Sequence, residues 1–251
     1  MSKDWDSYRC EIDGKPAAVF VDMGIAEDVP VERLPLAAWV QVAMLRADAD
    51  GPADAEEGAR LDAIEAALKA RLVSKATAYV GRVASGGRCD FYFYTAAAKG
   101  WKEQVANALA AFPDCRFQCG SRPDREWGIY LERLSPSDED LERLRNRRMC
   151  DSLQQGGDRL DRERPIEHCA YFPDVDARAE FVLRANALGF RAIEMIDPEE
   201  RGDQFGVRVS ALGIPSHRNI DALTLPLYHA ACECDGDYEG WETQVVGCSS
   251  A

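Results

Sequence analysis

The sequence contains no lysine after Lys102. From Asp158 onward, 18 acidic residues outnumber nine arginines, which accounts for −9 of the formal net charge of −14. Nucleic-acid binding depends on lysine and arginine contacts to phosphates, so this balance argues against direct binding of nucleic acid. It favours a basic protein partner, although an acidic surface also serves solubility alone.

The chain also has no apolar run long enough to span a bilayer, and residues 1–6 lack the apolar core of a secretory signal. We therefore expect a cytoplasmic protein with no membrane association. Its nine cysteines cannot all pair with one another, so we expect free thiols. No glycine-rich loop that would hold a phosphate precedes a predicted helix, and we predict no cofactor.

One segment near the middle of the chain is typical of a linker. Residues 154–165 combine a glycine pair, dense charge and a proline with a single large apolar side chain. We therefore predict two domains, 1–153 and 166–251, joined by this segment.

The first domain is predicted to be mixed α+β. Hairpin turns are indicated at Asp13-Gly14 and at residues 85–87. Between them, residues 54–73 carry apolar side chains at helical spacing. After the second turn, residues 126–131 are predicted to form a strand. Hairpins separated by helices argue against a doubly wound parallel sheet.

The second domain is predicted to be ferredoxin-like, with an antiparallel sheet and two helices. Asp174 is placed to cap the first helix, Gly189 to end it, and Ser216 to cap the second helix. The whole chain is therefore assigned to the α+β class. The predicted order in the second domain is βαββαβ, with strands at 166–172, 190–196, 204–212 and 238–246.

Two groups of residues suggest a metal site. His229, Cys232 and Cys234 are close in sequence, but their spacing is poor for tetrahedral zinc. The acidic run that starts at Asp235 begins like a calcium loop, but Val246 stands where the bidentate glutamate is needed. We therefore predict no metal site.

Two further pairs suggest nucleophilic catalysis. His168 and Cys169 are adjacent in a predicted strand, so their side chains should point to opposite faces. Ser216 beside His217 is better explained by helix capping. We predict no catalytic residue.

An acidic, glycine-punctuated turn leads into an aromatic strand at residues 235–245. Large aromatic side chains are usually buried, so Trp241 is either a core anchor or a recognition residue. We predict that Asp235, Asp237, Glu239 and Trp241 contact a protein partner.

Three motifs give the second domain a family resemblance: Tyr171–Ala177, Ala187–Phe190 and Gly236–Val245. Over roughly Pro165 to Val246 the chain resembles the RraB family of ribonuclease E activity regulators. The resemblance implies an acidic protein that binds ribonuclease E and lowers its activity without catalysing a reaction.

The first domain resembles the bacterial family called domain of unknown function 695, over roughly Trp5 to Leu153. The resemblance rests on four motifs: Gly14–Ala17, Val80–Arg82, Asp90–Tyr94 and Glu126–Tyr130. It implies no known activity.

Two alternatives remain. A ferredoxin-like sheet can stack RNA bases on exposed aromatic rings, and Phe205 or Tyr171 would be the rings available. The first domain could also be an unrecognised enzyme, for which the sequence offers only scattered tyrosine, tryptophan and aspartate residues.

Overall fold

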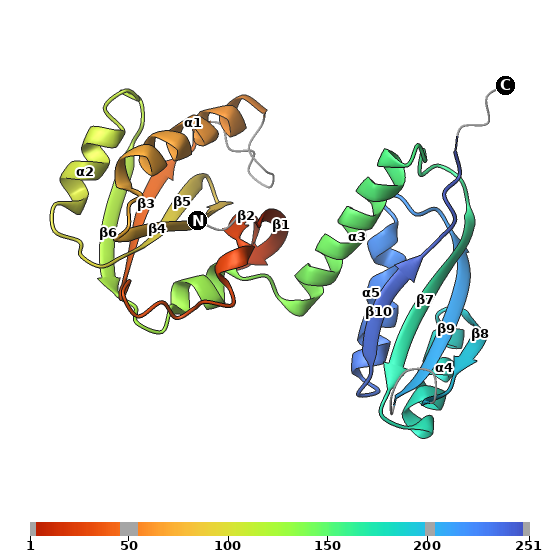
Figure 1. The fold of residues 1–251 in the computed structure, drawn as a ribbon. Coiled ribbons are helices and arrows are strands. Elements are labelled where there is room, and N and C mark those ends of the chain that lie inside the picture. The colour runs from red at the N-terminus through yellow and green to blue at the C-terminus, as the bar shows by residue number, and fades with distance from the viewer. Residues whose placement is uncertain (1–3, 46–54, 199–203, 248–251) are drawn as a thin grey trace. The chain divides into compact units, whose positions relative to one another are not determined.

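The chain folds into two compact units, Met1–Asp140 and Leu141–Ala251. The structure is a computed structural model that describes residues 4–45, 55–198 and 204–247. Each unit contains one antiparallel sheet with helices packed on it, as Figure 1 shows. The expected α+β class with two domains is therefore confirmed.

The first unit is built on a six-stranded sheet in the order β1-β2-β4-β5-β3-β6. Both predicted hairpin turns form: Asp13 and Gly14 have φ of 54° and 72°, and Gly86 and Gly87 have φ of 55° and 78°. Two successive residues at positive φ match the right-handed twist of the flanking strands. The strands are β1 (Trp5–Ile12), β2 (Lys15–Asp22), β3 (Leu36–Ala43), β4 (Thr77–Ser85), β5 (Arg88–Thr95) and β6 (Phe117–Pro123).

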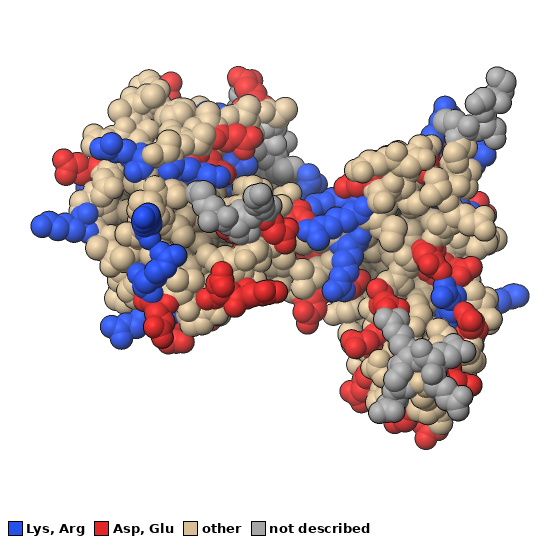
Figure 2. All heavy atoms as spheres, viewed as in Figure 1, with Lys and Arg blue, Asp and Glu red and all other residues tan. Residues whose placement is uncertain are grey.

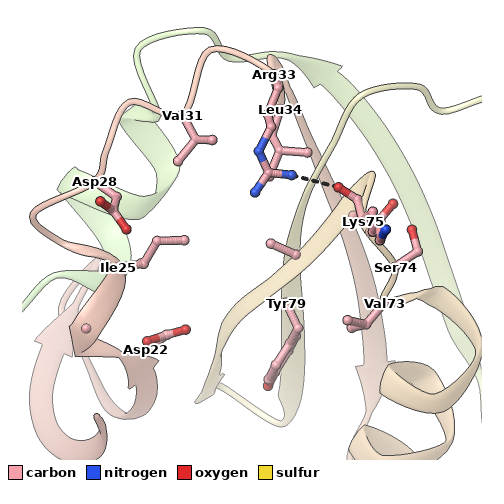
Figure 3. A pocket seen from close by; sticks show the side chains of 13 residues that line it. Asp22, Ile25, Asp28, Val31, Arg33, Leu34, Val73, Ser74, Lys75 and Tyr79 are labelled. Atoms are coloured by element: carbon pink, nitrogen blue, oxygen red, sulfur yellow. Dashed lines mark hydrogen bonds between the residues drawn. The ribbon is translucent and has the colours of Figure 1, made fainter. Parts of the chain in front are cut away.

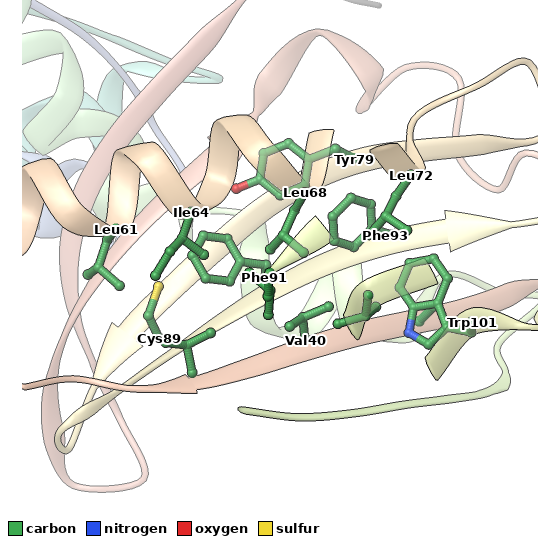
Figure 4. Packing of buried hydrophobic residues seen from close by; sticks show 14 residues of the cluster. Val40, Leu61, Ile64, Leu68, Leu72, Tyr79, Cys89, Phe91, Phe93 and Trp101 are labelled. Atoms are coloured by element: carbon green, nitrogen blue, oxygen red, sulfur yellow. The ribbon is translucent and has the colours of Figure 1, made fainter. Parts of the chain in front are cut away.

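Helices α1 (Ala55–Leu72) and α2 (Trp101–Ala108) pack with this sheet to form the core of the first unit. The apolar stripe of α1 lies against aromatic side chains of β4 and β5, as Figure 4 shows. The buried apolar residues of α1 are Leu61, Ile64, Leu68 and Leu72, the positions that helical spacing predicts.

The strand predicted at residues 126–131 is wrong, because this segment turns into the short helix η2 (Tyr130–Leu134). Asp124 accepts hydrogen bonds from the backbone N–H groups of Gly128 and Ile129 at 2.9 and 3.1 Å. A carboxylate that accepts from successive N–H groups caps a helical turn, so the chain cannot continue as a strand.

After helix α3 (Asp138–Gln155), the second unit has the element order βαββαβ and the sheet order β10-β7-β9-β8. Helices α4 and α5 cover one face, which in Figure 1 is the face behind the sheet. The core between them includes Phe172, Phe181, Val207 and Leu227. The elements are β7 (Arg164–Phe172), α4 (Val175–Ala187), β8 (Arg191–Ile196), β9 (Phe205–Gly213), α5 (Ile220–Cys232) and β10 (Asp237–Glu242).

Local signals explain how the helices of this unit begin and end. Asp174 caps α4 by accepting from the backbone N–H of Ala177 at 2.8 Å, and Gly189 follows the helix at φ 93°. Ser216 does not cap α5 with its side chain; instead its backbone carbonyl accepts from Asn219 and Ile220.

Residues 154–165, expected as a linker, lie inside the second unit. Helix α3 (Asp138–Gln155) runs into this segment, and the division between the units falls before Leu141. The Asp158 carboxylate is buried and pairs with Arg164 at 2.6 Å, and it accepts from the Val246 N–H at 2.8 Å. The charges that suggested an exposed linker are thus in part internal.

Candidate protein-binding surface

The three acidic residues predicted to contact a partner are exposed at one end of the second unit. Asp235 lies in the turn after α5 with φ 53°, and Asp237 and Glu239 lie on β10 at the edge of the sheet. Asp237 is paired in register with Tyr171 of β7. The turn and the edge strand therefore present three carboxylates to solvent.

Trp241 does not belong to this surface, because its side chain is only 7% exposed. It packs with Cys150, Leu153 and Ile166 in a separate cluster under α3. Its indole N–H donates to Oδ1 of Asn146 at 2.8 Å. Trp241 is an anchor between β10 and α3. The structure therefore corrects the prediction that Trp241 contacts a partner.

Asn146 is buried and connects three elements of the second unit. Its Nδ2 donates to Asp221 Oδ1 at 2.8 Å and to Thr224 Oγ1 at 2.6 Å, while its Oδ1 accepts from Trp241. Both the Nδ2 donor group and the Oδ1 acceptor of its side chain are therefore hydrogen-bonded within the unit. A satisfied buried network of this kind fixes how α3, α5 and β10 pack.

The face of the sheet that the helices leave open carries a group of charges that the sequence analysis missed. Arg208, on β9, pairs with Glu167 at 3.5 Å, with Glu194 at 3.2 Å and with Glu242. The three glutamates come from β7, β8 and β10, so each of the other three strands of the sheet contributes one carboxylate. Their side chains remain 38%, 55% and 66% exposed.

These glutamates and the exposed turn form one acidic surface, defined as Glu167, Glu194, Asp235, Asp237, Glu239 and Glu242. Glu239 lies with Glu167, Glu242 and Arg208 around a shallow hollow of about 280 Å³. In Figure 2 acidic side chains gather on this part of the second unit. Arg208 offsets only part of their charge, so the surface suits a cationic partner.

The residues considered for metal binding do not cluster in the part of the chain that the structure describes. No cluster of three or more histidine, cysteine, aspartate or glutamate side chains able to hold a metal occurs among these residues. The eight cysteines within the described ranges are free thiols.

His168 is a core residue rather than a catalytic base. It is 1% exposed, its ring packs edge-on against Phe190 at 5.1 Å, and Nδ1 is hydrogen-bonded to the Tyr238 hydroxyl at 2.8 Å. Burial lowers the pKa of His168 to about 3. The ring is therefore neutral near neutral pH and does not act as a proton acceptor there.

This burial predicts a pH dependence of stability. Below about pH 6.5 the unfolded chain binds a proton at His168 that the folded unit does not, so the free energy of unfolding should fall as pH decreases toward 3. His168→Gln should flatten this decline in thermal unfolding measured from pH 7 to pH 4. His229→Gln, at an exposed position, is the control, and an unchanged slope in His168→Gln would contradict the assignment.

The rings considered for RNA stacking are not available as open platforms. Tyr171 is 7% exposed and lies against Gly206 of the neighbouring strand. The Phe205 ring is half-buried, with the Arg178 guanidinium 5.4 Å from its centre. The open face of this sheet presents carboxylates instead, which repel phosphates.

Three aromatic residues of the first unit, Tyr94, Trp127 and Tyr130, are held by stacking and by hydrogen bonds to Asp124 and to the Asp22 backbone. Trp127 is fully buried and stacks on Tyr94 at 3.7 Å between ring centres. The Tyr94 hydroxyl donates to Asp124 at 2.6 Å, and the Tyr130 hydroxyl donates to the Asp22 carbonyl at 2.7 Å. These contacts explain the residues by packing and helix capping.

The comparisons with known proteins divide the chain in the same place. Residues 3–135, just over half of the chain, match the model of a family of unknown function (DUF695). The chain belongs to the DUF695 family. Residues 143–243 match the model of the regulator of ribonuclease activity B family, RraB. Both resemblances seen in the sequence are thereby confirmed.

Other comparisons add little to these two family matches. No curated protein matches the chain. A crystal structure of an unknown protein from Galdieria sulphuraria is 14% identical and covers 84% of this chain and 99% of its own, but its TM-score is 0.23. That value is too low to support an argument about the fold. Among the described residues, no helix has the length and hydrophobicity needed to cross a membrane.

Proposed function

We propose that this DUF695 protein is a non-catalytic cytoplasmic regulator of ribonuclease activity that binds a protein partner through the acidic surface of its second unit. The match to the RraB family supports the regulatory role. The proposed binding site rests on one observation, the exposed acidic surface around Arg208 and the turn before β10.

The partner that we propose is ribonuclease E, as the resemblance to RraB implies. The element order and the sheet order support a ferredoxin-like unit, in which both helices cover one face and leave the other free for docking. Exposed carboxylates steer a cationic surface toward this face, and that attraction weakens as salt increases. Regulation would follow from occlusion or restraint of the enzyme rather than from turnover.

Charge reversal at Asp237 and Glu239 tests the proposed surface. We expect Asp237→Lys with Glu239→Lys to weaken binding to purified ribonuclease E by at least about tenfold, because two attractive charges become repulsive. Binding is measured at several salt concentrations, together with cleavage of a single-stranded RNA by ribonuclease E in the presence of each variant. The salt dependence of binding should also become weaker.

The matched control is Asp161→Lys with Glu163→Lys, which makes the same charge change at the same spacing at exposed positions outside the acidic surface. An equal loss in both variants would mean that only net charge matters. Unchanged binding by the Asp237 and Glu239 variant would show that the partner docks elsewhere. Direct binding of the RNA by the wild-type protein at low salt would instead favour an RNA-binding module.

A further inference from the structure

A hollow of about 1020 Å³ in the first unit lies where β2 ends and β4 begins. Figure 3 shows its two sides. One side is formed by the loop that follows β2 and the short helix η1 (Met23–Ile25), and the other by the segment that joins α1 to β4. The volume is at the upper end of the range of small-molecule sites.

The two ends of this hollow carry opposite charges. Asp28 lies at one end, and Arg33 and Lys75 lie together at the other, as Figure 3 shows. The Arg33 guanidinium donates through Nη1 to the Lys75 backbone carbonyl at 2.7 Å, which holds the guanidinium over the hollow. Positive charge therefore lies at one end and negative charge at the other.

Two of these charged groups have no internal role that would explain them. The Lys75 ammonium and the Asp28 carboxylate make no hydrogen bond or ion pair with any other residue in the described ranges. Both are exposed, while the buried Asp22 adds a second carboxylate to the lining on the side of Asp28. Neither group is needed to hold the fold together.

Apolar side chains line the hollow between its charged ends. Ile25 and Val31 on one side face Val73 on the other, and all three are half-buried, with the buried Leu34 behind them. Such a lining binds an aliphatic group, while a few polar groups at defined positions fix its orientation. The arrangement has an apolar centre and two ends of opposite charge.

We propose that this hollow is a binding site for a small zwitterion with an aliphatic centre, the chemistry of a short peptide with free ends. The ligand carboxylate meets Arg33 and Lys75, its ammonium meets Asp28, and its side chains lie against Ile25, Val31 and Val73. A nucleotide fits less well, because Asp22 and Asp28 repel a polyanion. This proposal concerns the first unit and does not depend on the proposed regulation of ribonuclease activity.

Calorimetric titration of the full chain with leucyl-leucine tests the site, with the N-acetylated, the C-amidated and the doubly blocked dipeptides as comparison ligands. We expect leucyl-leucine to bind and each single block to weaken binding by about tenfold, since each removes one charged contact. Absence of binding by leucyl-leucine, or equal binding of the free and doubly blocked forms, would overturn the proposal. Tighter binding of a mononucleotide would overturn it as well.

Two variants connect each end of the ligand to one side of the hollow. Lys75→Gln should weaken the free dipeptide but not the C-amidated form, and Asp28→Asn should weaken the free dipeptide but not the N-acetylated form. Since neither side chain has an internal partner in the described structure, both variants should fold. Lys99→Gln and Asp114→Asn, at exposed positions outside the hollow, are the matched controls and should bind like the wild type.

Discussion

Replacing Trp241 by alanine should destabilise the second unit by about 3–5 kcal/mol, the range for truncating a buried tryptophan. The indole is 7% exposed and packs with Cys150, Leu153 and Ile166. Its removal opens a cavity between β10 and α3 and also leaves Asn146 Oδ1 without its donor. Hydrogen exchange of the β7 and β9 amides in the full chain measures the loss for this unit alone.

Trp241→Phe helps to separate the two contributions, because it keeps a buried six-membered ring but removes the pyrrole half of the indole with its N–H donor. Its cost should be about 1–3 kcal/mol, the penalty for an unsatisfied buried acceptor. If Trp241→Ala left amide exchange unchanged but abolished capture of ribonuclease E, the indole would be a contact residue after all. That result would support the prediction, made from the sequence, that Trp241 contacts a protein partner.

The sequence could not decide between these roles for Trp241. Its hydrogen-bond partner, Asn146, lies 95 residues earlier in the chain, on a helix whose packing no local pattern reveals. The exposure of Asp235, Asp237 and Glu239 was predictable, because charged side chains in and next to a turn are rarely buried. The two kinds of residue share one motif, but tertiary packing alone distinguishes them.

Features that depend on neighbouring residues were predicted well. The positive φ angles at Asp13 and Gly14 and the cap at Asp174 each involve residues at most three positions apart. Residues 126–131 were predicted wrongly because the capping carboxylate of Asp124 stands just before the segment and outside the pattern considered. Short apolar runs do not by themselves distinguish a strand from a helical turn.

The charge cluster around Arg208 depends on strand order and register. Side chains alternate between the two faces along β9, so Arg208 lies on the face opposite to that of Val207 and Val209. Its position on the open face therefore followed from the sequence. The register that brings Glu167, Glu194 and Glu242 to it involves three other strands. Four strands must be correctly aligned before these side chains become neighbours, and composition provides no such alignment.

Arg164→Met should destabilise the second unit by about 3–5 kcal/mol, because it leaves the Asp158 carboxylate buried without its cation. The side chains of Arg164 and Asp158 are 7% and 2% exposed, and their closest atoms are 2.6 Å apart. A flexible linker would tolerate the same change at no cost. Amide exchange of β7 and β10 is the measurement, and Arg162→Met, at an exposed neighbouring position, is the control.

The same carboxylate predicts how this stabilisation depends on pH. Burial alone would raise the pKa of Asp158, but the Val246 and Leu160 N–H groups and the Arg164 guanidinium together hold that pKa below its ordinary value of 3.8. The folded state therefore releases the proton more readily than the unfolded chain, so the stabilisation is complete above about pH 5 and is lost as the pH falls through the lowered pKa. The free-energy difference between the wild type and Asp158→Asn should accordingly shrink between pH 5 and pH 3, by up to about 1 kcal/mol. A difference that stayed constant over this range would mean that folding leaves the pKa of Asp158 unchanged, and a difference that grew as the pH fell would mean that the carboxyl is protonated in the folded unit. Either result would contradict the stabilising ion pair with Arg164.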